Sequence, residues 1–233
     1  MKRIALLLAL CLVIVGAVGA WWHFVIIPER EEDEVNDFAE FLKQYYKDKT
    51  ASYEVENATL GEVDVAFIGD SLTDGYDLAQ YYPDLSVINR GIGGDTTHGV
   101  LARLEVSVIE PAPKVVIMMI GTNNIDDMFT DYEDIIIRMK EALPDTEIVV
   151  LSVTPVSNAD PVRNGKIALA NVKIEALAKK HGITYVDMFT PLYDLEAEGL
   201  RAEYTTDGLH FTPLGYEVIT ATLRSVIDDF LAE

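Results

Sequence analysis

Three residues of this sequence are of the types that acyl transfer requires. Ser71 lies in FIGDSLTDG (67–75), at the end of the short apolar run VDVAFI (63–68). The run is short and bounded by turn residues, so it predicts a buried strand followed by a tight turn that carries Ser71. Asp207 and His210 stand three residues apart in DGLHFTPLGY, near the end of the chain. These side chains could serve as a nucleophile, a general base and the group that orients the base.

Two further motifs follow predicted strands. NRGIGGDTT (89–97) contains Gly93, whose backbone N–H could point outward, and GTNN (121–124) contains Asn123. Each motif alone has an ordinary structural explanation, because Gly-Asp-Ser is a common strand-to-helix turn and a single histidine is more often a surface residue. The carboxyl ends of parallel strands meet at one rim of a sheet, however, and there the motifs together supply every part of acyl transfer.

Short apolar runs alternate with segments of helical spacing after Gly61. The runs predict five strands at 63–68, 86–89, 114–120, 147–153 and 183–188. The helical spacing predicts helices over 96–104, 131–143 and 161–181, and a last helix from Pro213. Strands that are buried on both faces and separated by crossover helices are typical of a parallel sheet. The sequence therefore predicts a three-layer α/β/α sandwich with a five-stranded parallel sheet.

The four motifs, in this order, resemble those of the SGNH hydrolase superfamily, also called the GDSL esterase and lipase family. The resemblance covers about residues 63–230 and departs from the common pattern at Asn124, where many members have aspartate. It implies a flavodoxin-like sandwich, hydrolysis of esters or thioesters, and no metal or organic cofactor.

The same resemblance implies a role for each matched residue. Ser71 is the expected nucleophile, His210 the general base, and Asp207 the residue that orients the imidazole. The expected oxyanion hole consists of the backbone N–H groups of Ser71 and Gly93 and the side-chain amide of Asn123.

The substrate is less well defined by the sequence. We expect a serine esterase that acts on O-acetyl groups of cell-surface glycans or on short-chain acyl lipids and lysophospholipids. An O-acyltransferase and a catalytically silent glycan- or lipid-binding module are the alternatives. The formal net charge of −21 over 233 residues argues against a nucleic-acid partner, since binding to phosphates needs clustered Lys and Arg. The sequence leaves the oligomeric state open.

The N-terminus has the pattern of a membrane-targeting element. Lys2 and Arg3 precede an apolar run over 4–27, which as a helix would be about 36 Å long, enough to cross a hydrocarbon core of about 30 Å. We expect a transmembrane signal anchor over 1–27, with the catalytic domain outside the cytoplasm. Cleavage after Ala20 and secretion is the alternative.

An acidic amphipathic helix and linker are expected over 28–60, ahead of the hydrolase domain at 61–233. Aromatic residues recur at helical spacing in the acidic segment, among them Phe38, Phe41 and Tyr45. Exposed, they would form an aggregation-prone patch, so they predict packing against the domain or against a neighbouring protomer.

Overall fold

The computed structural model describes residues 27–232 of the chain. The predicted signal anchor over 1–27 lies outside the described residues except for Ile27, so it stays a prediction. Within the described part of the chain, no helix is both long enough and apolar enough to cross a membrane.

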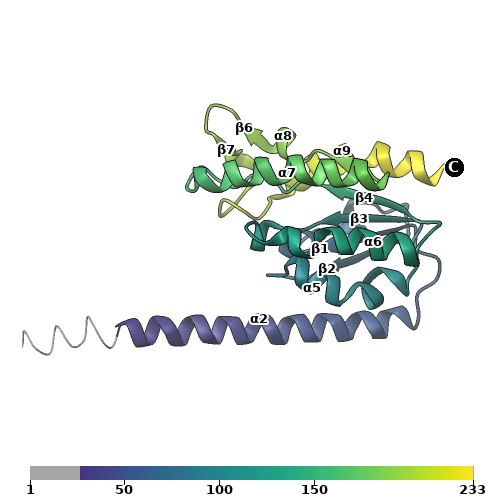
Figure 1. Ribbon diagram of the computed structural model, residues 1–233, viewed down its shortest axis with the longest axis horizontal. Helices are drawn as coiled ribbons and strands as arrows, with labels where there is room; N and C mark the ends of the chain where they lie inside the picture. The colour runs from purple at the N-terminus through teal and green to yellow at the C-terminus, as the bar shows by residue number, and fades with distance from the viewer. Residues whose placement is uncertain (1–26, 233) are drawn as a thin grey trace, which may run out of the picture. The chain divides into compact units, whose positions relative to one another are not determined.

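A parallel sheet of five strands forms the centre of the domain, in the order β2-β1-β3-β4-β5 (Figure 1). The strands are β1 Val65–Gly69, β2 Val87–Gly91, β3 Val115–Met119, β4 Glu147–Leu151 and β5 Thr184–Val186. The predicted strands and the predicted α/β class are confirmed. The chain leaves β1 toward β2 on one side and later returns to β3 on the other. The carboxyl ends of β1, β2 and β3 therefore border the crevice where open sheets of this kind bind ligands.

Helices cover both faces of the sheet because successive side chains of a strand point to opposite sides. Ala66 and Ile68 of β1 belong to one buried cluster, which includes apolar residues of α5, α6 and α7. Val65 and Phe67 belong to a second cluster, built largely with α9. The four helices are α5 Thr97–Ala102, α6 Tyr132–Ala142, α7 Pro161–His181 and α9 Pro213–Leu231. All four correspond to predicted helices.

Several short elements were not predicted. The short α-helices are α3 Ser71–Asp74, α4 Leu78–Tyr81 and α8 Phe189–Leu192, and a two-stranded hairpin consists of β6 Tyr193–Asp194 and β7 Gly199–Leu200. A π-helical turn spans Glu105–Ile109, and 3-10 turns span Thr122–Asn124, Met128–Thr130 and Ala202–Tyr204. Segments of this length are too short to show a hydrophobic period in the sequence. They are stable only through packing on the rest of the domain.

The helix predicted over the acidic segment is α2, Ile27–Asn57, and the described chain divides within it, after Tyr45, into two units. In the first unit, the exposed rings of Phe38 and Phe41 stack with centroids 6.4 Å apart. In the second unit, the end of α2 packs on the domain, and Tyr53 is only 1% exposed. Tyr46, a residue of the predicted apolar stripe, also contacts the domain within this unit, where its hydroxyl donates to Gly99 O at 3.0 Å.

Candidate active site

Ser71, His210 and Asp207 form one continuous chain of hydrogen-bonding atoms. His210 Nε2 lies 3.0 Å from Ser71 Oγ, and His210 Nδ1 lies 2.7 Å from Asp207 Oδ2. The three residues predicted as nucleophile, base and orienting carboxylate therefore lie in contact, although Ser71 and His210 are 139 positions apart in sequence.

The nucleophile turn is fixed from both sides. Asp70 precedes α3 as its N-cap, and its side chain accepts a hydrogen bond from Leu72 N at 3.0 Å. The Tyr216 hydroxyl from α9 donates to Leu72 O at 2.9 Å. Ser71 is thus the first residue of a short helical turn that begins where β1 ends, which places its hydroxyl at the rim of the sheet.

A tight turn before α9 positions Asp207 and His210. Asp207 Oδ1 accepts hydrogen bonds from the backbone N–H groups of Leu209 and His210, at 2.9 and 2.8 Å. The hydrogen bond with the His210 side chain, aided by those two N–H groups, lowers the pKa of Asp207 to about 2. Asp207 is therefore a carboxylate at neutral pH, and it holds the Nδ1 proton of His210 so that Nε2 faces Ser71 as the acceptor.

Two of the expected oxyanion donors, Asn123 and Gly93, already make a hydrogen bond within the protein. Asn123 follows β3 and donates one Nδ2 hydrogen bond to Asp95 O at 2.8 Å, which leaves its second N–H available. Gly93 N donates to Asp74 Oδ2 at 3.1 Å, so that N–H already has a carboxylate partner.

The next residue of the glycine-rich loop after β2, Gly94, was not predicted as an oxyanion donor. It has a φ of +76°, a left-handed conformation that favours glycine. Within residues 27–232, the N–H groups of Ser71 and Gly94 make no hydrogen bond. The Gly-Gly doublet was the sequence signal for a strained loop, but it could not show which of the two N–H groups was free.

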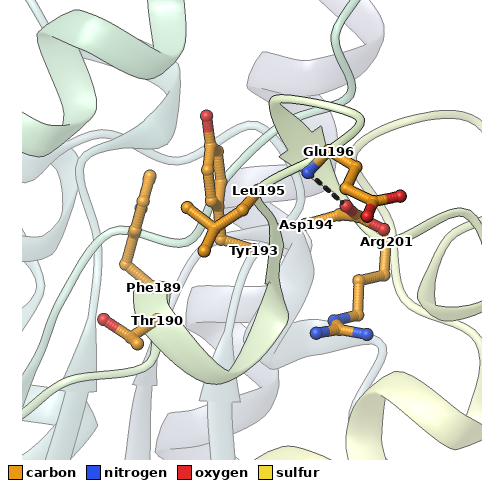
Figure 2. Close-up of a pocket in the computed structure, with 7 residues that line it drawn as sticks. All are labelled: Phe189, Thr190, Tyr193, Asp194, Leu195, Glu196 and Arg201. Atoms are coloured by element: carbon orange, nitrogen blue, oxygen red, sulfur yellow. Dashed lines mark hydrogen bonds between the residues drawn. The ribbon is translucent and has the colours of Figure 1, made fainter.

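The site is open to solvent. The side chains of His210 and Asp207 are 46% and 52% exposed. Beside Asn123 lies a cavity of about 630 Å³, lined by 122–127 and Arg163. A second cavity of about 670 Å³ is lined by residues of 189–196 and by Arg201 (Figure 2), and none of the candidate catalytic residues contributes to it. No cluster of His, Cys, Asp and Glu suited to a metal occurs among the residues that the structure describes.

A Ser-His-Asp arrangement at the rim of a parallel α/β sandwich is the geometry of a serine hydrolase. The chain belongs to the GDSL-like Lipase/Acylhydrolase family, which matches residues 67–218. This confirms the resemblance to the SGNH superfamily and shows that the protein is a serine ester hydrolase.

Individual relatives agree with this family. Human platelet-activating factor acetylhydrolase IB subunit alpha2 is 31% identical over 193 residues, 74% of this chain and 79% of the relative. A GDSL-like lipase from Bacteroides thetaiotaomicron has 27% identity and a TM-score of 0.70, over 77% of this chain and 97% of that one. An acetylxylan esterase from Geobacillus stearothermophilus shares the fold, with a TM-score of 0.60 and 19% identity over 72% of this chain and 95% of that one.

Proposed function

We propose that the protein hydrolyses short acyl esters through an acyl-enzyme on Ser71. The observation that carries the proposal is the unbroken contact from Ser71 Oγ through the His210 ring to Asp207. A family member could lack one of these groups, whereas this chain has all three within hydrogen-bonding distance.

In the proposed reaction, His210 Nε2 takes the Ser71 proton while Oγ attacks the ester carbonyl. Asp207 stabilises the imidazolium that forms. The tetrahedral intermediate then collapses, and the imidazolium gives its proton to the departing alcohol. A water molecule, deprotonated by the same nitrogen, then attacks the acyl carbon. The bond from this carbon to Ser71 Oγ breaks, the imidazolium returns the proton to Oγ, and the acid is released. The open rim gives water direct access to the acyl-enzyme.

The proposed oxyanion hole consists of the N–H groups of Ser71 and Gly94 and the second amide N–H of Asn123. The sequence pointed to Gly93, but the Gly93 N–H donates to Asp74. A donor that is already bound to a carboxylate cannot stabilise a developing oxyanion without losing that bond. Gly94 is therefore the better candidate.

The proposed substrates are O-acetyl groups on glycans and short acyl chains on lipids. Both have small acyl groups, which need no deep apolar channel. They therefore fit a site at the rim where the His210 and Asp207 side chains are about half exposed. The human relative is named as an acetylhydrolase of platelet-activating factor, which supports a small acyl group.

A panel of acetylated glycans, lysophospholipids and acyl thioesters, assayed with wild type and Ser71→Ala, tests the proposal. We expect wild type to hydrolyse short acetyl esters fastest and Ser71→Ala to lose that activity. Ser86→Ala is the matched control, because Ser86 Oγ donates to Glu62 O in an exposed loop before β2. Equal rates for Ser71→Ala and wild type would refute the assignment of the nucleophile.

Labelling by a fluorophosphonate distinguishes an enzyme from a silent binding module. A reactive Ser71 supports the enzyme, and a folded protein without labelling supports the module. Adding a sugar acceptor and measuring transferred acetate separates hydrolysis from O-acyl transfer.

We also propose that residues 1–27 anchor the enzyme in the membrane with residues 28–233 outside the cytoplasm. The apolar run and the preceding Lys2 and Arg3 support this topology. Protease added to intact cells should then digest the domain. Protection of the domain would contradict the topology, and release of soluble protein would indicate cleavage.

A further inference from the structure

We propose that Asp74 and Lys49 are positioning residues that hold the glycine-rich loop in its oxyanion-binding conformation. The inference rests on the proposed function, since it concerns the donors for that reaction. The two carboxylate oxygens of Asp74 bind two different segments of the chain. Asp74 Oδ1 lies 2.9 Å from Lys49 Nζ, and Asp74 Oδ2 accepts the Gly93 N–H at 3.1 Å.

Asp74 also belongs to the nucleophile turn. It is the last residue of α3, which Ser71 begins, and its backbone N–H donates to Asp70 O at 2.9 Å. Its side chain therefore joins the turn that presents the Ser71 oxygen to the loop that presents the Gly94 N–H. A fixed distance between nucleophile and donor is what oxyanion stabilisation requires.

The two segments approach closely in their backbones as well. A Cβ placed on Gly91 would lie 2.1 Å from Asp74 N, so only glycine permits this contact. Asn89 Nδ2 donates to Thr73 O at 2.7 Å, and Asn89 Oδ1 accepts from Gly91 N at 2.8 Å. These contacts fix the base of the loop. The Asp74 carboxylate then determines the peptide orientation at Gly93, one residue before the proposed donor.

Lys49 makes the carboxylate a well-oriented acceptor. Its side chain is 27% exposed and that of Asp74 is 17% exposed, so water screens the pair less than it screens a surface ion pair. Hydrogen bonds to an ionised acceptor are shorter and stronger than neutral ones. Without Lys49, the carboxylate would lose its cation partner and hold the Gly93 N–H less firmly.

The end of α2 supports the same loop at two further points. The Tyr53 hydroxyl donates to Gly91 O at 2.7 Å, and the Tyr46 hydroxyl donates to Gly99 O at 3.0 Å. Lys49 lies between these tyrosines in sequence, so three residues of one helix bind the loop and its flanks. The contacts lie within residues 46–233, which form one compact unit.

The test compares Lys49→Met, Lys49→Arg and Asp74→Asn with wild type as full-length chains. We expect Lys49→Met to lower kcat for p-nitrophenyl acetate about tenfold with KM within about twofold, because a misplaced donor costs less than a deleted one. Lys49→Arg should restore most of kcat, because it keeps the cation. Rates are expressed per fluorophosphonate-reactive site, so a loss of folded protein does not lower them.

Lys114→Met is the matched control. It removes an ion pair of equal length, 2.9 Å, between Lys114 and Asp64, which directly precede β3 and β1 and so lie at the edge of the sheet opposite the rim that carries Ser71. We expect its kcat to equal that of wild type. An equal loss in Lys114→Met and Lys49→Met would overturn the proposal, as would an unchanged kcat in both Lys49→Met and Asp74→Asn.

Amide hydrogen exchange over 89–97 provides a second measurement that needs no substrate. The proposal requires faster exchange at Gly93 in Lys49→Met and Asp74→Asn, but not in Lys114→Met. Unchanged exchange in both loop variants would overturn it. If wild type hydrolysed no ester, the proposed function would fail, and the exchange rates would still decide whether Lys49 and Asp74 hold the loop.

Discussion

At the scale of single residues, the proposed chemistry depends on how each polar atom is shared between partners. Asp207 uses one carboxylate oxygen for two backbone N–H groups and the other for the His210 ring. Asn123 uses one amide hydrogen for Asp95 O and keeps the other. The structure thus separates groups that maintain the loops from groups that are free to meet a substrate.

Asp207→Asn should lower kcat by up to roughly 10⁴-fold, because an amide cannot hold the Nδ1 proton in place or stabilise the imidazolium. Asp194→Asn is the control, since Asp194 also accepts two backbone N–H groups, from Glu196 and Ala197, but has no such bond to a histidine. Steady-state kinetics on a short acetyl ester measures both. A decrease of similar size in the two variants would show that the loss is structural.

Asn123→Ala should lower kcat roughly 100- to 1000-fold, the usual cost of one oxyanion donor, and leave KM nearly unchanged. The control is Asn124→Ala, because the Asn124 amide donates to Thr97 Oγ1 at 2.9 Å and not to the site of the oxyanion. If Asn123→Ala raised KM at constant kcat, the amide would bind the ground state and not the oxyanion.

At the scale of elements, the N-cap of the short helix α3 makes the free energy of unfolding depend on pH. Asp70 is 1% exposed, and burial raises the pKa of its carboxyl from 3.8 to about 7. The folded protein therefore binds this proton more tightly than the unfolded chain does. As pH rises from about 4 to above 7, the free energy of unfolding falls, by up to about 4 kcal/mol from this group.

Asp70→Asn should remove this pH dependence, since an amide oxygen can still accept from Leu72 N but does not ionise. We expect the melting temperature of wild type to fall more between pH 5.5 and pH 8 than that of the variant. Thermal unfolding followed by circular dichroism measures the difference. Parallel pH curves would show that Asp70 does not titrate in this interval.

The end of α2 is a second element whose contribution can be measured. Tyr53→Phe keeps the buried ring but deletes the hydroxyl that donates to Gly91 O. The acceptor would stay buried without this partner, so the free energy of unfolding should fall by about 1–3 kcal/mol. Phe38→Leu, an exposed change on the same helix, is the control. Equal urea midpoints for Tyr53→Phe and wild type would mean that water replaces the hydroxyl.

At the scale of the whole molecule, the net charge of −21 affects which esters reach an exposed site. Repulsion should raise KM for an anionic ester, and salt should weaken the repulsion. We expect KM for the anionic ester to fall roughly two- to fivefold between 20 mM and 500 mM NaCl, on the basis of Debye screening. A neutral ester of equal acyl length is the control. The same salt effect on both esters would point to a change in the enzyme and not to charge repulsion.

The sequence by itself determined the sheet, the helices α5, α6, α7 and α9 and the identity of the catalytic candidates. Strands buried on both faces require unbroken apolar runs, and helices require apolar residues at regular spacing, so both leave a local pattern. Ser71, Asp207 and His210 were recognisable because their motifs, together with those of Gly93 and Asn123, follow predicted strands in the order of a known family.

Only the tertiary structure decided which backbone N–H groups near Ser71 are free. Gly93 and Gly94 are identical in chemistry and adjacent in sequence, and they differ because Asp74, nineteen residues earlier, binds one of them. Lys49 of α2 likewise gains its role from a partner on α3. Hydrogen bonds between distant segments have no periodicity, so the arrangement of donors around the nucleophile emerges only when the chain is folded.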